Sequence, residues 1–315
     1  MSGPTSRYTA DLDLRAVNDA HILAIGRVPA NSRVLDLGMA DGSVAAMLKD
    51  MGCRVWGVEL DPEAAETARS VCEEVVVADL NDLDLAERFK GQQFDVILML
   101  DILEHLSDPV AVLERVSMVR AEDGWGVISL PNVAHISLRL ALLKGRFTYT
   151  DVGLLDRTHL RFFDRAGVDD LLRQSGWEMF DMARVTRRFG TTEVHVDDAD
   201  PELVQQLETE PEALTYQFVV SAAPVGSAVL QHPPVLPAAV VQDVLFGAQA
   251  RIAELQARIA ELDEELRQLR LTHLPDLMEQ LTAIRASGLA RRGHLTHLLA
   301  ALHENSERIG HLLSG

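Results

Sequence analysis

The sequence predicts an α/β fold in which a seven-stranded, mostly parallel sheet is covered by helices. Two features support this prediction. Before residue 223, short β-branched apolar runs alternate with longer segments of helical spacing, which is typical of parallel strands joined by crossover helices. The first five of these runs are apolar almost throughout, as expected for strands that are buried on both faces of a sheet.

The predicted strands follow one another along the first two thirds of the chain. The five parallel candidates are residues 33–37 (RVLDL), 54–59 (RVWGVE), 74–78 (EVVVA), 94–100 (FDVILML) and 125–130 (WGVISL). Two further candidates, residues 177–185 and 216–222, would complete the sheet, and helices are expected in the gaps. The predicted first domain therefore spans residues 1–222.

The rest of the chain differs in composition. Residues 223–237 are predicted to be a linker, because the stretch around them contains four of the twelve prolines and no charged residue. Residues 238–315 are predicted to form a C-terminal helical, coiled-coil extension. A heptad seam runs through it, formed by Ile252, Leu255, Ile259, Leu262, Leu266 and Leu269. This seam favours a homo-oligomer; the alternative is that the tail helices pack on the first domain.

Charge and composition exclude several classes of protein. The chain has 48 acidic against 29 basic residues, a net charge of −19, so nucleic acid and anionic membranes are poor partners. It has only two cysteines and no signal-like opening segment, which favours a reduced, cytoplasmic location. No apolar run approaches the roughly 18–20 residues that a membrane span requires.

The first predicted strand leads into a turn of small residues that suits a nucleoside. Asp36 ends this strand, and Gly38, Met39 and Gly42 form the turn, where glycine lets the backbone approach a ligand closely. Glu59 stands 21 residues after Gly38, at the end of the second strand. An acid at this distance can accept hydrogen bonds from both ribose hydroxyls. The sequence therefore predicts a nucleoside site.

The spacing of this site resembles that of class I S-adenosylmethionine-dependent methyltransferases. A dinucleotide fingerprint does not fit, because Ala40 and Ser43 occupy its second and third glycine positions. The resemblance implies a Rossmann-like fold with S-adenosylmethionine as cofactor, and Ala40 replaces the middle glycine of the family's first motif. It also implies that Leu60 lies beside the cofactor, and that Asp79 and Leu80 flank the adenine.

The end of the fourth predicted strand, DILEH, resembles the segment found in ubiquinone-type O-methyltransferases and in many sugar and antibiotic methyltransferases. Asp101, Glu104 and His105 are therefore expected to face the cofactor methyl group or the acceptor. In the ubiquinone-type enzymes this segment resembles a divalent-ion site, so these three residues are an alternative metal site. A metal ion is possible but not expected, since base catalysis alone can methylate sugar hydroxyls.

A base is needed near the methyl group, and residues 131–165 are predicted to be an insertion that shapes the acceptor pocket. The sequences PNVAH, GRFTYTD and LDRTHLRFF in this region resemble methyltransferases of surface-glycan and natural-product assembly. His159 is the favoured general base, positioned by Asp156 or Arg157, and His105 and His135 are the other candidates. Alternatively, the DRTH segment pins a lid and His159 is structural, while His105 caps a turn.

The predicted function is O-methylation of a sugar hydroxyl on a glycan or glycosylated metabolite. Alternatives are methylation of a phenol, an amine or a carboxylate, and a cofactor-binding scaffold that recruits a glycosyltransferase through its tail. Basic residues in the insertion are expected to form a local positive patch over the site. They are Arg139, Lys144, Arg146, Arg157 and Arg161.

Overall fold

The computed structural model describes residues 18–234, together with Arg258 and Arg267. The chain divides into two units, Met1–Asp243 and Val244–Gly315, and the second lies almost entirely outside the described residues. The residues of the predicted coiled coil, on which the predicted homo-oligomer depends, therefore lie almost entirely outside the described residues. Among the described residues, no helix combines the length and the hydropathy that a bilayer span requires.

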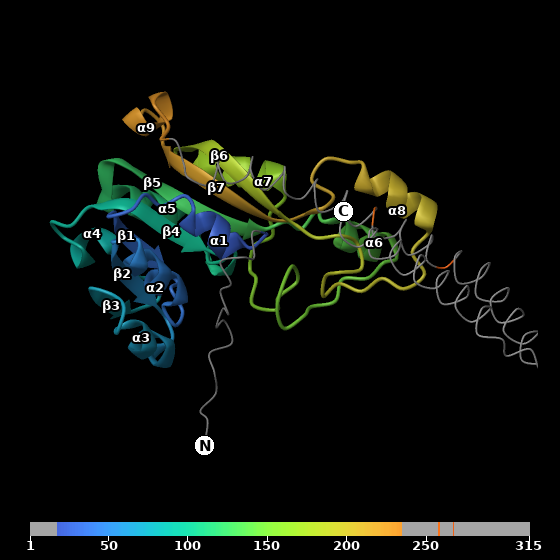
Figure 1. The fold of residues 1–315 in the computed structure, drawn as a ribbon, viewed down its shortest axis with the longest axis horizontal. Coiled ribbons are helices and arrows are strands. Elements are labelled where there is room, and N and C mark those ends of the chain that lie inside the picture. The colour runs from blue at the N-terminus through green and yellow to red at the C-terminus, as the bar shows by residue number, and fades with distance from the viewer. Residues whose placement is uncertain (1–17, 235–257, 259–266, 268–315) are drawn as a thin grey trace, which may run out of the picture. The chain divides into compact units, whose positions relative to one another are not determined.

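The sheet has the seven strands that the sequence predicts, in the order β3-β2-β1-β4-β5-β7-β6. Strands β1 to β5 run parallel, and β7 lies antiparallel between β5 and β6 (Figure 1). The strands are β1 (Arg33–Leu37), β2 (Arg54–Glu59), β3 (Glu74–Val77), β4 (Phe94–Leu100), β5 (Arg120–Pro131), β6 (Trp177–Thr186) and β7 (Thr215–Pro224).

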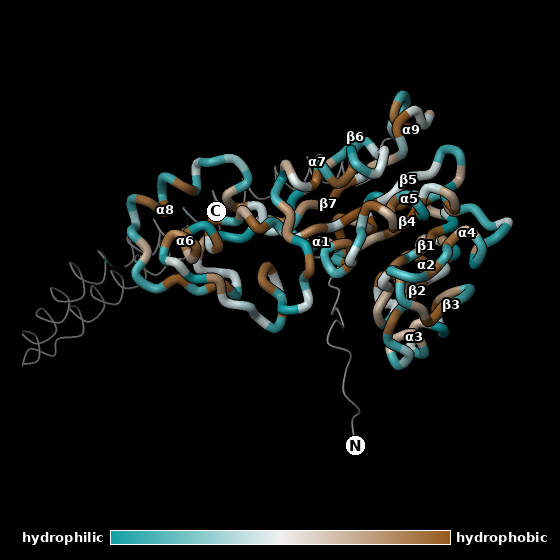
Figure 2. The backbone as a smooth tube through the Cα atoms, turned by 180° about the vertical axis from the view of Figure 1, so that it is seen from behind, coloured by the Kyte–Doolittle hydropathy of each residue, from teal (hydrophilic) through white to brown (hydrophobic). Residues whose placement is uncertain are grey.

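Helices cover both faces of this sheet. They are α1 (Ala20–Ile25), α2 (Ser43–Asp50), α3 (Pro62–Ala68), α4 (Leu85–Arg88), α5 (Pro109–Val119), α6 (Ile136–Leu143), α7 (Arg165–Gln174), α8 (Pro201–Glu208), α9 (Ala228–Gln231) and the 3-10 helix η1 (Leu103–His105). Successive residues of a strand point to opposite faces, so Val34 joins a core under α1, α2 and α3, whereas Leu35 joins a core under α4, α5 and α7. The strands at the centre are accordingly the apolar part of the molecule (Figure 2).

The end of β7 changes one predicted boundary. Strand β7 runs to Pro224, and α9 follows within the segment that the sequence assigned to the linker. Val229 of α9 is buried in the core on the α1 side. The first part of the predicted linker therefore belongs to the folded unit, because the side chain of Val229 packs in the core of that unit.

The segment between β5 and α7 lies beyond the carboxyl ends of the parallel strands. Its helix α6 packs near α8, and two small apolar clusters stabilise this region (Figure 1). The predicted insertion, residues 131–165, thus comprises the last residue of β5, helix α6 and a long loop that returns to η1. This return places residues 156–163 beside the end of β4.

Candidate functional site

The turn after β1 adopts the backbone conformation of a glycine-rich loop. Gly38, Ala40 and Gly42 all have positive φ, at +78°, +50° and +83°. At Gly38 a Cβ atom would lie 2.8 Å from Cδ1 of Ile102, so only glycine fits there without displacement. Ala40 takes a left-handed conformation that costs a non-glycine residue roughly 1–2 kcal/mol. Ala40 adopts this conformation despite its cost, so the turn keeps its left-handed backbone although alanine replaces glycine.

Glu59 at the end of β2 is tied to this turn. Its Oε2 accepts a hydrogen bond from the Ala40 amide at 2.8 Å, and its Oε1 accepts from the amides of Leu60 and Asp61 at 2.8 and 2.9 Å. A carboxylate has about four lone-pair positions, so after these three bonds about one remains to accept from a ligand hydroxyl. The carboxylate thus fixes the turn and lies where the sequence predicts the ribose contact.

Asp36 lies beneath the turn and is buried, with 2% of its surface exposed. Burial raises the pKa of Asp36 to about 7, with His21 opposing the shift and Glu59 adding to it. Burial alone would lower the pKa of His21, but Asp19, Asp101 and Asp36 outweigh it, so the pKa of His21 is raised. His21, on α1, was not recognised in the sequence. An ammonium group near Asp36 would favour its ionised form.

Asp101 at the end of β4 is held by two neighbouring strands. Its Oδ1 accepts from the Ser129 hydroxyl of β5 at 2.7 Å, and both carboxylate oxygens lie 2.9 Å from Nε2 of Gln217 on β7. Its φ is +50°, which is strained for a residue other than glycine. Strain of this kind persists where surrounding contacts hold it, so the carboxylate is fixed in orientation at the mouth of the site.

The remaining predicted cofactor residues are placed differently. The side chain of Met39 is buried and its Sδ occupies the space that a Cβ on Gly57 would need, so Met39 offers a ligand only its backbone. Leu80 is buried in the core under α4 and α5, whereas Leu60 is 64% exposed. Asp79 is exposed and accepts hydrogen bonds from Asn81.

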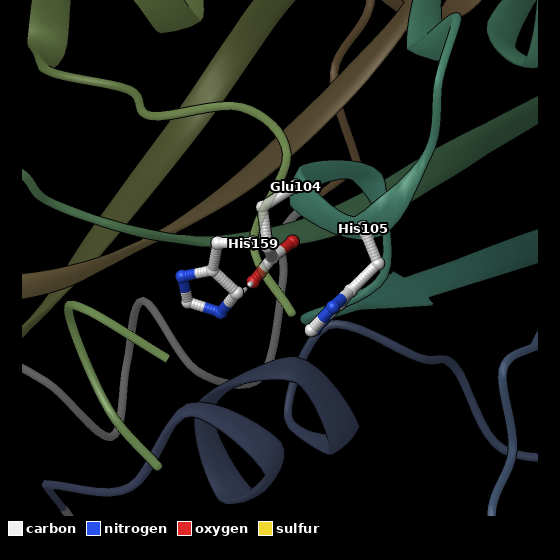
Figure 3. Close-up of side chains that lie close together, drawn as sticks. All are labelled: Glu104, His105 and His159. Carbon is white, nitrogen blue, oxygen red and sulfur yellow. Dashed lines mark ion pairs between the residues drawn. The ribbon is translucent and has the colours of Figure 1, made fainter. Parts of the chain in front are cut away.

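Glu104, His105 and His159 come together from two segments (Figure 3). Glu104 is 1% exposed, and burial raises its pKa well above the ordinary value of a glutamate. Burial lowers the pKa of His159, and the nearby His105 lowers it further. Oε2 of Glu104 and Nδ1 of His159 are buried and lack a hydrogen-bond partner among the described residues.

The distance between Glu104 and His159 is longer than a tetrahedral metal site allows. Its ligand atoms lie within 4.8 Å of one another, and Oε1 of Glu104 is 4.0 Å from Nε2 of His159. Around one tetrahedral ion with bonds of about 2.0–2.2 Å, ligand atoms are roughly 3.3–3.6 Å apart. Asp101 of the sequence-based alternative is instead bound by Ser129 and Gln217. We assign no step to a metal ion.

The raised pKa of Glu104 leads to a prediction about the free energy of unfolding. Glu104→Gln is expected to change the free energy of unfolding by less than about 1.5 kcal/mol at pH 4.5, because the amide has the shape of the acid. Unfolded glutamate ionises near pH 4.3, and because the pKa of folded Glu104 is raised above this value, its contribution to stability falls as the pH rises. The variant should therefore gain relative to the unmodified protein between pH 4.5 and 8.

Urea unfolding at both pH values, with and without a chelator, measures this difference. Glu114→Gln, on the exposed surface of α5, is the matched control and should show no such trend. If the chelator destabilises the unmodified protein and not the variant, a bound cation compensates the charge of Glu104, and the upward shift of its pKa is wrong.

The insertion presents apolar and aromatic side chains rather than free positive charge. Seven of the eleven exposed large apolar residues in the described part of the chain lie between residues 142 and 162. Phe147, Tyr149 and Phe162, here called the aromatic wall, contact one another edge to face, with centroids 5.5 and 5.8 Å apart. Phe162 lies 6.2 Å from His159, which in turn lies 4.8 Å from His105. The wall therefore continues the line of the two histidines.

Two of the five cations in the positive patch expected from the sequence are paired with carboxylates, and two others donate to uncharged carbonyl oxygens. Arg157 pairs with Asp151 at 2.6 Å, and Arg139 pairs with Glu210 at 2.6 Å. Lys144 donates hydrogen bonds to the carbonyl oxygens of Asp197 and Asp198, and Arg161 donates one to the carbonyl oxygen of Ser107. Four of the five basic side chains are thus engaged within the protein, and for Arg139, Lys144 and Arg161 the sequence could not reveal this because those partners are distant in the chain.

His135, the third candidate base, has a structural role. It is fully buried, its Nδ1 accepts from the Ser137 amide at the start of α6, and its Nε2 lies 2.9 Å from the carbonyl oxygen of Arg187. Burial lowers its pKa. Both ring nitrogens are used in capping α6 and joining it to the end of β6, so His135 is not the base.

Comparison with known proteins agrees with this architecture. Residues 10–181 match the methyltransferase domain family. The ubiquinone biosynthesis O-methyltransferase of Thiobacillus denitrificans is 27% identical over 192 residues, covering 58% of this chain and 80% of that protein. The enzyme of the same name from Burkholderia pseudomallei is 24% identical, covering 57% and 78%. A methyltransferase structure from Thermotoga maritima, described as a possible histamine N-methyltransferase, has 19% identity and a TM-score of 0.47, covering 66% of this chain and 89% of that one.

Proposed function

Because the chain belongs to the family of methyltransferase domains and is an S-adenosylmethionine-dependent methyltransferase, we propose that it methylates a sugar hydroxyl with His105 as general base. The observation that supports this proposal most directly is the line of rings from His105 through His159 to the aromatic wall. It joins a group that can take a proton to a surface that can hold an acceptor.

The residues of the turn fit the cofactor. Gly38 and Ala40 bring backbone close to the ligand, Glu59 offers acceptor oxygens to the ribose, and Asp36 lies where a carboxylate can receive the ligand ammonium. When bound, S-adenosylmethionine supplies an electrophilic methyl group on a sulfonium. The protein then has to align the acceptor oxygen with that methyl carbon and remove its proton.

His105 suits the role of base better than His159. It is only partly buried, at the carboxyl end of β4, whereas the side chain of His159 is 6% exposed and faces Glu104. Burial lowers the pKa of His159, which makes it a weaker base than an ordinary histidine. In this proposal His159 supports the His105 ring from the side, and the acceptor hydroxyl gives its proton to His105.

A neutral sugar fits the acceptor surface. The rings of Phe147, Tyr149 and Phe162 are 43%, 51% and 36% exposed, so their faces can stack on the C–H face of a pyranose ring. Pairing of Arg139 and Arg157 with carboxylates leaves less positive charge for an anionic acceptor. Cys53 and Cys72 are free thiols, which fits the reducing cytoplasm as the place of reaction.

The experiment incubates the full chain with S-adenosylmethionine and a panel of acceptors, and detects methylated product by mass. Methyl glycosides of neutral hexoses and deoxyhexoses represent the proposed class, and catechols, amines and carboxylates represent the others. Methylation confined to the glycosides supports the proposal. Methylation of the catechols alone would overturn the sugar assignment and leave the methyltransferase activity in place.

The aromatic wall gives a prediction about acceptor binding. Phe147→Ala and Tyr149→Ala are each expected to raise KM for the glycoside by about 2- to 13-fold, since one stacked ring contributes roughly 0.5–1.5 kcal/mol. Cofactor affinity should not change. Steady-state kinetics measures the effect, and Met118→Ala, which is 67% exposed near the end of α5, is the control. An unchanged KM in both variants would place the acceptor elsewhere.

A phenolic acceptor is the second candidate, because the Thiobacillus and Burkholderia relatives carry the name ubiquinone biosynthesis O-methyltransferase. The same base and the same aromatic wall could serve a phenol. The panel above separates the two classes. Recruitment of a glycosyltransferase through residues 238–315 is a further proposal, tested by whether removal of the tail abolishes a complex without abolishing methyl transfer.

A further inference from the structure

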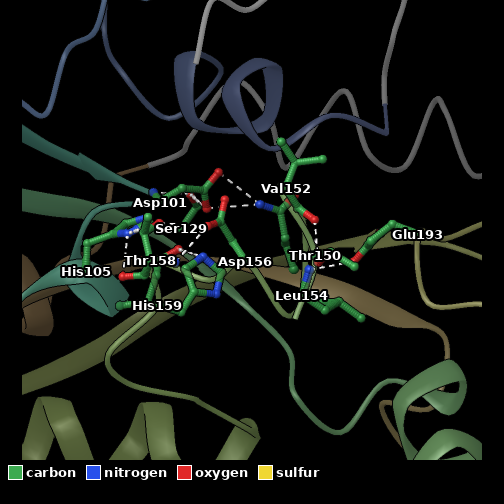
Figure 4. A network of polar contacts seen from close by, with 12 residues as sticks. Asp101, His105, Ser129, Thr150, Val152, Leu154, Asp156, Thr158, His159 and Glu193 are labelled. Atoms are coloured by element: carbon green, nitrogen blue, oxygen red, sulfur yellow. Dashed lines mark hydrogen bonds and ion pairs between the residues drawn. The ribbon is translucent and has the colours of Figure 1, made fainter. Parts of the chain in front are cut away.

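The Nδ1 side of His105 is occupied by one residue of the insertion. Nδ1 lies 3.1 Å from the hydroxyl oxygen of Thr158 and 3.3 Å from its carbonyl oxygen. The Thr158 hydroxyl in turn donates to Oδ1 of Asp156 at 2.7 Å, and the Thr158 amide donates to the same oxygen at 2.8 Å. Figure 4 shows the series Asp156, Thr158 and His105 from the loop to the end of β4.

The direction of these hydrogen bonds determines the tautomer of His105. A threonine hydroxyl has one proton, and here Asp156 receives it. The same hydroxyl oxygen can therefore only accept from His105, and the Thr158 carbonyl oxygen is also only an acceptor. Both contacts require a proton on Nδ1 of His105. In the neutral ring the lone pair then belongs to Nε2.

The position of Thr158 relative to His105 is fixed by the backbone. The carbonyl oxygen of Glu104, in η1, accepts from the amides of Leu160 and Arg161 at 2.8 and 3.0 Å. The loop with Thr158 is thereby joined to the 3-10 helix with His105. Further along the loop, the Leu154 amide donates to Glu193 at 2.6 Å, and Gly153 leaves room for that carboxylate because a Cβ would lie 2.3 Å from it.

We propose that Thr158, supported by Asp156, is a positioning residue that holds His105 in the tautomer whose Nε2 receives the proton of the acceptor hydroxyl. This inference rests on the proposed function, in which His105 is the base. The acceptor oxygen forms a bond to the methyl carbon as the carbon–sulfur bond breaks, and the electron pair of that bond stays on sulfur. The hydroxyl proton passes to Nε2, and the imidazolium keeps its hydrogen bond to Thr158.

Two substitutions at one position separate hydrogen bonding from packing. Thr158→Val keeps the shape and removes the hydroxyl, and it is expected to lower kcat by about 10- to 100-fold, the usual effect of losing a charge-assisted hydrogen bond. KM and cofactor affinity should stay within about 3-fold, a difference worth under 1 kcal/mol. Thr158→Ser keeps the hydroxyl and should restore kcat to near the original value. The acidic limb of the pH–kcat profile should shift in the valine variant only.

Thr150→Val is the control within the same loop, because its hydroxyl donates to the Val152 carbonyl oxygen and is not among the contacts of His105. It should leave kcat unchanged. Unchanged kcat in Thr158→Val, or equal losses in the valine and serine variants, would overturn the role of the hydroxyl.

A spectroscopic measurement tests the tautomer without any turnover. Nitrogen-15 NMR of the histidine rings in the full chain, assigned with His105→Gln, should show protonated Nδ1 and unprotonated Nε2 at high pH, and Thr158→Val should reduce this preference. The opposite tautomer would overturn the inference even if the enzyme is active. The expected tautomer without methylation of any acceptor would instead count against the proposed function.

Discussion

His105→Ala is expected to lower kcat by about 10²- to 10⁴-fold, the usual contribution of a positioned general base. The expected loss is large because a sugar hydroxyl is a weak acid and its oxygen is a poor nucleophile until its proton is removed. The affinity for S-adenosylmethionine should stay within about 3-fold, because the predicted cofactor contacts come from the turn after β1 and from Glu59. Single-turnover methylation and calorimetry measure the two effects separately.

His159→Phe is the variant to be compared with His105→Ala. It keeps a ring 4.8 Å from His105 and 6.2 Å from Phe162 but cannot take a proton. A loss of less than about 10-fold is expected, the scale of one or two aromatic contacts. If His159→Phe abolishes turnover and His105→Ala does not, the two histidines exchange roles, and His159 is the base.

Glu59→Ala is expected to weaken binding of S-adenosylmethionine by about 10- to 150-fold, corresponding to roughly 1.5–3 kcal/mol for hydrogen bonds to a charged acceptor. Two effects add in this variant. The ribose loses its acceptor, and the Ala40 amide loses the carboxylate that holds the turn in its left-handed conformation. Isothermal titration calorimetry gives the dissociation constant directly.

Glu59→Gln and Glu63→Ala complete this test. Glutamine keeps one acceptor oxygen and should lose less affinity than alanine, whereas Glu63, an exposed acid in the first turn of α3, should not matter. Equal affinity of the alanine variant and the unmodified protein would show that Glu59 serves neither the ribose nor the turn.

The strands were predictable because each is marked by an apolar run within its own few residues of sequence. Residues 33–37 and 94–100 are apolar on both faces, and the strands observed there have the predicted bounds. The position of β7 between β5 and β6 was not predictable, since hydrophobic pattern does not encode which strands become neighbours. The turn after β1 was also recognisable, because glycine at positions 38 and 42 has a direct backbone consequence.

Side-chain partners from distant segments account for what the sequence did not reveal. Gln217 is separated from Asp101 by 116 residues, and nothing in its surroundings marks it as a site residue. His21 lies in a short apolar helix without a motif. The insertion placed Asp156 beside Thr158 in the sequence, but only the fold shows that Thr158 contacts His105 rather than His159.

The antiparallel placement of β7 has a consequence for how the protein is made. Asp101 receives its hydrogen bonds from Ser129 and from Gln217, so this part of the proposed cofactor site needs a strand that is synthesised late. Contacts of such long sequence separation form slowly, because a large loop must close before they stabilise the chain. A nascent chain that ends before residue 215 contains every sequence motif of the site but lacks the strand that orients Asp101. We therefore expect the orientation of Asp101 to be completed only near the end of translation of this domain.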